Sequence, residues 1–171
     1  VNDTSICFGE NLVSNAGNIG DIYLWNTGAI SQTITVDSAG TYFVRVTNAN
    51  GCSASDTINL YLNPLPVVNL GNDTSICFDE NLVLNAGNIG NTYLWNTGAT
   101  TQTITVESAG TYSVRVTNAN GCSSSDTINV GINPLPIINL GNDTSICFGE
   151  SLVLNADNIG DTYLWNTGAT S

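Results

Sequence analysis

Apolar and polar residues alternate along most of this chain. Between residues 111 and 117, Tyr112, Val114 and Val116 occupy one face and polar residues occupy the other. A period of two predicts strands that are buried on one face. The Asn120-Gly121 pair that follows favours a hairpin turn, because both residues tolerate positive φ. The chain contains no stretch of helical period, so the pattern predicts an all-β sandwich.

Short strands separated by turns account for the whole of this pattern. In the central part of the chain, the predicted strands cover 67–70, 81–86, 93–95, 102–106, 111–117 and the stretch that contains Ile128, Val130 and Ile132. Turn signals recur every 8–12 residues or so, which is typical of a sandwich built from short strands.

The pattern repeats every 70 residues. The same seven residues, Tyr-Leu-Trp-Asn-Thr-Gly-Ala, occur at 23–29, 93–99 and 163–169, and residues 2–71 match 72–141 at 56 of 70 positions. This period is too long for one rung of a solenoid and indicates a string of small domains. The predicted organisation is a first repeat at 1–63, a linker at 64–66, a second repeat at 67–133, a linker at 134–136, and the first half of a third repeat at 137–171.

The sequence begins and stops inside this pattern, so we expect it to be an excerpt of a longer array. Each linker holds two prolines, as in Asn63-Pro64-Leu65-Pro66 and Asn133-Pro134-Leu135-Pro136. Proline fixes φ and removes a hydrogen-bond donor, so these segments favour semi-rigid extended spacers. We therefore expect a stiff rod of domains.

Composition excludes most chemistry. The net charge is −12, the only cations are Arg45 and Arg115, and the chain has no Lys, His or Met. Without His or Lys there is no Ser-His or Cys-His nucleophile, no Schiff-base lysine and no His metal site. Nucleic acid is excluded as a partner because phosphate binding needs clustered cations, and no apolar run is long enough for membrane insertion. We expect no enzyme activity and no cofactor.

The five cysteines suggest disulfides. Each complete repeat has two, Cys7 with Cys52 and Cys77 with Cys122, while the partner of Cys147 is expected outside the excerpt. Parity equally allows Cys52–Cys77 and Cys122–Cys147. We favour one disulfide within each domain, on the expectation that both cysteines lie at the same end of the sandwich. A 70-residue domain has a marginal core, and disulfides place a protein outside the cytosol.

The repeat resembles a known family. Its cysteines, Tyr-x-Trp, Thr-x-Thr-Ile-Thr-Val, Gly-Thr-Tyr and Gly-Cys positions together resemble the Ig-like/PKD-like repeats of large surface adhesins of Bacteroidetes. The resemblance covers the whole sequence. It implies tandem Ig-like β-sandwich domains in a secreted or surface-attached array, typically exported by type IX secretion, and it brings no catalytic residues.

Several residues carry alternative interpretations. Trp25, Trp95 and Trp165 suit stacking on a sugar, but a tryptophan on a central strand more often packs in the core, which we favour. The side chains of Asp73, Asp79 and Glu80 offer oxygen ligands for Ca²⁺. Position 9 is glycine where position 79 is aspartate, so the set is not kept between repeats and is a weak calcium candidate.

Two further sets of surface residues are singled out. Arg45 and Arg115 are expected to pair with a cross-strand acid. Asp-Ser or Asp-Thr followed by a small or aliphatic residue resembles the O-glycosylation sequence of Bacteroidetes. That motif marks three hydroxyl residues as candidate acceptors: Ser38, Thr57 and Thr127.

The near-identical modules, the stiff linkers and the lack of residues for catalysis predict a structural protein. We expect an extracellular, cell-surface repeat protein that forms a stalk, an adhesin or a self-associating filament, with itself as a partner. The alternative is an array of carbohydrate-binding modules that binds a surface glycan by avidity.

Overall fold

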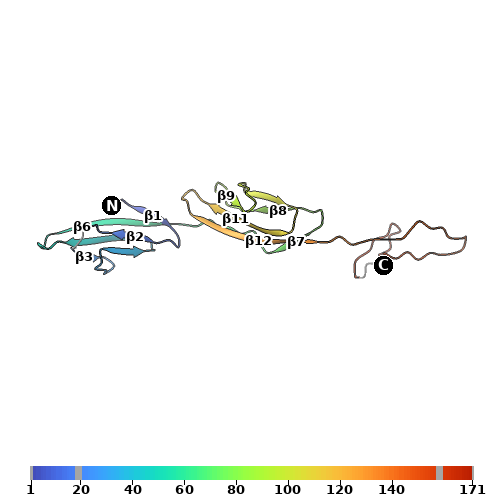
Figure 1. The fold of residues 1–171 in the computed structure, drawn as a ribbon, viewed down its shortest axis with the longest axis horizontal. Helices are drawn as coiled ribbons and strands as arrows, with labels where there is room; N and C mark the ends of the chain where they lie inside the picture. Colours follow the sequence, from blue (N-terminus) through green and yellow to red (C-terminus); the bar gives the residue numbers. More distant parts are fainter. Residues whose placement is uncertain (1, 18–20, 157–159, 171) are drawn as a thin grey trace.

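The computed structural model describes residues 2–17, 21–156 and 160–170. These residues form twelve strands and no helix. The strands make two sandwiches that lie end to end, followed by a segment without strands (Figure 1). We call residues 2–63 domain 1 and residues 67–133 domain 2. No described segment is a helix long and apolar enough to span a membrane.

Domain 1 is built from six strands: β1 (Thr4–Cys7), β2 (Leu12–Asn15), β3 (Ile22–Trp25), β4 (Thr33–Val36), β5 (Gly40–Thr47) and β6 (Ser53–Asn63). One sheet has the order β1-β6-β5-β3, and β2 pairs with β4 in the other. All pairings are antiparallel except that of β1 with β6, in which Cys7 lies opposite Asn63.

Domain 2 repeats this topology with β7 (Thr74–Cys77), β8 (Leu82–Asn85), β9 (Thr92–Trp95), β10 (Thr103–Val106), β11 (Gly110–Thr117) and β12 (Ser123–Asn133). Its sheets have the orders β7-β12-β11-β9 and β10-β8. The structure thus confirms the predicted all-β fold of tandem Ig-like sandwiches.

Alternation determines which residues enter the core between the two sheets. In domain 2, Trp95, Val114 and Val116 point inward from one sheet, and Leu84 and Val106 point inward from the other. Val114 and Val116 are at most 1% exposed, whereas Arg115 between them is exposed. The period of two along β11 therefore determines its buried face.

Two predicted features of the strands need correction. Residues 67–70 were expected to form the first strand of the second repeat, but they run extended without pairing in a sheet. The first strand is β7 instead, which is parallel to β12 and was not predicted. Val68 and Leu70 still pack on the core of domain 2, but backbone groups of this segment bond to the side chains of Asp126 and Asn88.

The described residues beyond 137 keep the local turns of the repeat but not its strands. The Trp165 N–H donates to the Ala169 carbonyl at 2.9 Å, as the Trp95 N–H does to Ala99. The 144–147 stretch has the same four residues as β7, yet it forms no strand. Turns close on near neighbours, whereas β7 requires the distant strand β12 as its partner.

Candidate functional site

The residues selected from the sequence do not converge on a binding site. Trp25 and Trp95 are buried, and the Nε1–H group of each donates to a backbone carbonyl, that of Ser31 and Thr101 respectively. Trp165 is half-buried in the segment without strands. The rings of Trp25 and Trp95 are therefore unavailable for stacking on a sugar.

The proposed calcium ligands have other roles. Asp73 accepts hydrogen bonds from the side chain and backbone N–H of Asn129, which lower the pKa of its carboxyl group. The Glu80 carboxylate accepts the Cys77 N–H, and Asp79 has a φ of 66° in the same turn. Within the described residues, no three acidic or cysteine side chains gather as metal ligands would.

The remaining candidates lie on the surface. Ser38, Thr57 and Thr127 are all exposed, the first in the turn before β5 and the others on β6 and β12. Arg45 and Arg115 do not bond a cross-strand acid as expected. They donate to the hydroxyl groups of Ser53 and Ser123.

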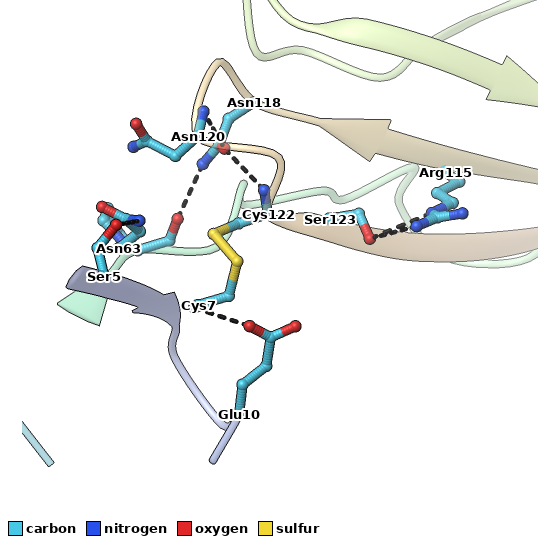
Figure 2. Close-up of a disulfide and its surroundings, with 10 residues drawn as sticks. Ser5, Cys7, Glu10, Asn63, Arg115, Asn118, Asn120, Cys122 and Ser123 are labelled. Carbon is cyan, nitrogen blue, oxygen red and sulfur yellow. Dashed lines mark hydrogen bonds between the residues drawn. A yellow bond between two sulfur atoms is a disulfide. The ribbon is translucent and has the colours of Figure 1, made fainter. Parts of the chain in front are cut away.

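A disulfide joins the two domains where they meet. Here the sulfur atoms of Cys7 and Cys122 form a disulfide, with a Cα–Cα distance of 5.5 Å (Figure 2). Cys122 is only 1% exposed. Cys52, Cys77 and Cys147 are free and exposed. The favoured pairing of Cys7 with Cys52 is therefore wrong, and so is that of Cys77 with Cys122.

Strand length explains this correction. Cys7 lies opposite Asn63 at the end of β6, whereas Cys52 immediately precedes its first residue, Ser53. β6 has 11 residues, which at about 3.3 Å per residue separates the two cysteines by about 33 Å. They therefore occupy opposite ends of one domain. Cys122 is at the start of β12, so it faces Cys7 across the linker.

Each cysteine of the disulfide is held by a turn. After β1, the Cys7 N–H donates to the Glu10 carboxylate at 3.0 Å, and the Glu10 N–H donates back to the Cys7 carbonyl. Before β12, the Asn118 Oδ1 atom accepts the N–H groups of Asn120 and Cys122. Gly121 completes this turn with a φ of 80°. The hydrogen bonds of each turn lie within one domain. Each cysteine is therefore positioned by its own domain.

The linker is part of the same assembly. The Asn118 side-chain amide that shapes the turn also donates to the Pro64 carbonyl at 2.9 Å. Pro66 is buried, whereas its counterpart Pro136 is exposed. The first linker is therefore fixed by contacts with domain 2 in addition to the stiffness of proline.

The chain then continues into domain 2 as residues 67–70, which we call the docking segment. The Leu70 N–H donates to the Asp126 carboxylate at 2.7 Å, and the Asn88 amide donates to the Val67 carbonyl at 2.7 Å. Val68 and Leu70 pack against the core. The disulfide, the fixed linker and the docking segment together form what we call the junction.

Domain 1 has a groove at the position that the docking segment fills in domain 2, because the counterparts of residues 67–70 in the 70-residue register fall before residue 1 of this sequence. Its volume is about 270 Å³, and its lining includes Ala16, Val46 and residues 54–58. Ala16 and Val46 are half-buried, whereas their counterparts Ala86 and Val116 are at most 1% exposed. Covering by the docking segment is the main difference between these two sites.

No family model matches this sequence, and no curated protein matches it. Among solved structures, the insect immune protein hemolin aligns with 78% of this chain and 45% of its own, at 13% identity and a TM-score of 0.41. The Ig1–Ig2 pair of DIP-gamma aligns over 77% and 93%, at 9% identity and 0.38. The Ig1-2 module of the Drosophila receptor phosphatase DLAR aligns over 77% and 95%, at 12% identity and 0.34.

Proposed function

We propose that this chain is a structural segment of an extracellular rod, of the kind used as a surface stalk or adhesin. The observation that carries the proposal is the Cys7–Cys122 disulfide, which joins consecutive domains and leaves each domain without an internal crosslink in the described residues. A crosslink between domains fixes their relative positions, which serves a rod and adds nothing to an isolated binding module.

The surroundings of this bond support an extended architecture. The two sandwiches lie end to end along the long axis (Figure 1). Persistence of the disulfide requires an oxidising compartment, which agrees with an extracellular location. The resemblance to Bacteroidetes adhesin repeats extends the proposal to a cell-surface protein exported by type IX secretion. On such a surface, the exposed Ser38, Thr57 and Thr127 are the candidate O-glycan acceptors.

The two arginines provide a direct test. Trypsin, which cleaves after Arg and Lys, yields fragments 1–45, 46–115 and 116–171 from the denatured, unreduced chain. The Cys7–Cys122 bond leaves 46–115 released and joins the two outer fragments. Pairing within each repeat joins all three fragments instead. We expect mass spectrometry to find the outer pair, and the test uses a Cys147→Ser variant to exclude a bond from Cys7 to Cys147.

The rod itself is tested by small-angle X-ray scattering of the same sample. We expect the maximum dimension of the unreduced protein to match two domains placed end to end. If reduction of the disulfide leaves the scattering curve and the maximum dimension unchanged, the disulfide has no role in holding the rod straight.

A further inference from the structure

We propose that copies of this chain associate side by side through the free edges of strands β4 and β10. Both strands read Thr-Ile-Thr-Val, and each accepts the same edge of a second copy as an added antiparallel strand. This inference rests on the rod proposed above and names its partner and its contact.

The free edge belongs to the repeat itself. Within the described residues, β10 pairs only with β8 and β4 pairs only with β2. The segments on either side of β10, residues 96–102 and 107–109, are too short to supply another strand. β10 is open although domain 1 precedes it, and β4 is open although domain 2 follows it. Neither a preceding nor a following domain therefore covers this edge.

The backbone of β10 directs hydrogen-bonding groups to the open side. The Ala86 N–H donates to the Gln102 carbonyl at 3.0 Å, so these two residues form a hydrogen-bonded pair between β8 and β10. Such pairs alternate along an antiparallel ladder, so Thr103 and Thr105 turn their N–H and C=O groups away from β8. The Thr103 carbonyl accepts the Thr101 hydroxyl at 2.6 Å and keeps a second lone pair.

The side chains of β10 suit an added strand. Thr103 and Thr105 are exposed on the outer face, whereas Ile104 is half-buried against the core of domain 2. A hollow of about 570 Å³ lies along this strand, and its lining includes Ile104 and Tyr112. Threonines that lie opposite each other on neighbouring strands form favourable pairs. An added strand thus finds a threonine pair on one face and apolar surface on the other.

The edge lacks the features that keep edges apart. Proteins usually protect a free edge with charged residues, proline or a bulge. Residues 22–36 and 92–106 include no charged residue and no proline, although the chain has 14 acidic residues. The pairing of β10 with β8 is regular and has no bulge. A cationic partner finds no acid along this edge, whereas an identical edge matches it in charge and hydrogen bonding. The occupant is therefore a second copy.

One antiparallel register satisfies both copies. When the pairing is centred on Ile104, Thr103 of each copy lies opposite Thr105 of the other. Each of these two pairs exchanges two backbone hydrogen bonds. Glu107 then lies opposite Thr101, about 20 Å along the strands from Glu107 of the second copy. That separation exceeds the screening length of about 8 Å at physiological salt, so the two acids repel little.

The contact is isologous, because the same edge is used on both copies. Each chain has two such edges, β4 and β10, so a copy that is paired through one edge still offers the other. Association can therefore continue sideways beyond a dimer. A longer array of the same repeat would offer more edges and bind more strongly by avidity.

The experiment uses the full chain with Cys52→Ser, Cys77→Ser and Cys147→Ser, which keeps the Cys7–Cys122 disulfide and removes the free thiols. Sedimentation velocity over a concentration series measures association. We expect oligomers that grow beyond a dimer as the concentration rises. A protein that stays monomeric throughout would overturn the proposal.

A matched pair of double variants tests the backbone contact. Thr35→Pro/Thr105→Pro removes an outward N–H group from each edge, a position where edge strands tolerate proline, and should abolish association. Thr35→Val/Thr105→Val keeps both N–H groups and should still associate. Tryptophan fluorescence checks that both variants are folded. Association that is lost in both variants, or kept in both, would overturn backbone pairing.

Cysteine crosslinking tests the register without proline. Thr103→Cys and Thr105→Cys are made separately in the same background and incubated with oxidised glutathione. Their equimolar mixture should give at least about tenfold more disulfide-linked dimer than either variant alone, because identical positions lie about 7–8 Å apart on the diagonal. Disulfides need Cα–Cα distances below about 7 Å. Equal yields, or no dimer from the mixture, would overturn the contact.

Tryptic mapping of the same samples separates this inference from the proposed function. If the copies do not associate while fragments 1–45 and 116–171 remain joined, the contact between copies fails and the rod stands. If those two outer fragments are not joined, the proposed function fails.

Discussion

Residues 2–71 and 72–141 match at 56 of 70 aligned positions, yet the cores of domains 1 and 2 close to different degrees. Val116 is fully buried in domain 2, whereas the identical Val46 is half-buried in domain 1. The four residues Val67–Leu70 make much of this difference, because they cover the core of domain 2 and tie it to the preceding linker. A repeat therefore depends on the chain that enters it, and the junction belongs to the structural unit as much as the sandwich does.

Removing the disulfide should have the largest effect on this comparison. The bond closes a loop across 115 residues, so the chain-entropy model gives it about 5 kcal/mol of stabilisation. In the Cys7→Ser/Cys122→Ser protein, we expect this stability to be lost and the two domains to unfold at different urea concentrations. Cys147→Ser, which removes an exposed free thiol, is the control. Urea titration followed by tryptophan fluorescence measures the stability and the unfolding midpoint of each domain. Coincident midpoints for the unsubstituted protein, the double variant and the control would contradict the prediction.

Truncating the docking segment should open the core of domain 2 alone. Leu70→Ala removes a partly buried side chain, so we expect a loss of about 2 kcal/mol, at the low end for Leu→Ala substitutions. Leu140→Ala makes the same change in the exposed counterpart and should cost almost nothing. The measurement is native-state hydrogen exchange at the Val116 amide. Equal protection in both variants would mean that the docking segment does not close this core.

Two equivalent asparagines isolate one contact of the junction. Asn118 and Asn48 make the same turn before their cysteines, but only Asn118 also donates to the Pro64 carbonyl. Asn118→Ala should therefore cost about 1 kcal/mol more than Asn48→Ala, the usual net value of one hydrogen bond. Urea unfolding measures the difference between the two variants. A larger loss in Asn48→Ala would show that the linker contact contributes nothing.

The smallest effect concerns acid stability. The side chain and then the backbone N–H of Asn129 lower the pKa of Asp73 in the folded state. A carboxyl group with a lowered folded pKa stabilises the fold above its unfolded pKa of about 3.9, and this contribution is lost as the pH falls through the folded pKa. We expect Asp73→Asn to flatten the decline in stability below about pH 4. A series of urea midpoints from pH 6 to pH 2 tests this, and parallel curves would contradict it.

Local patterns predicted the sandwich well. The alternation at Tyr112, Val114 and Val116 identified both strand β11 and its buried face, and Asn120-Gly121 identified the turn before β12. These features depend on neighbours in the sequence. They survive even in the region beyond residue 137, where the Trp165 turn forms without any strand.

Features that depend on distant partners were missed. The four residues of β7 include little apolar alternation, and the strand exists because β12 lies beside it. The docking segment looked like a strand because its apolar residues face a core, but nothing in its sequence shows that it lacks a strand partner. The disulfide was assigned within a domain because the parallel placement of β1 at the far end of β6 was not visible from the spacing of Cys7 and Cys52.

The same disulfide determines how the rod responds to mechanical tension. A pull on the two ends of the chain passes through the Cys7–Cys122 bond, so the residues between them carry no load. These residues, 8–121, could otherwise extend by about 400 Å if both domains unravelled. While the bond is intact, only two parts of the chain can extend: the residues up to the end of β1 and those from β12 onward. The redox state of the surroundings therefore decides whether this segment is a nearly inextensible tether or a long, compliant one.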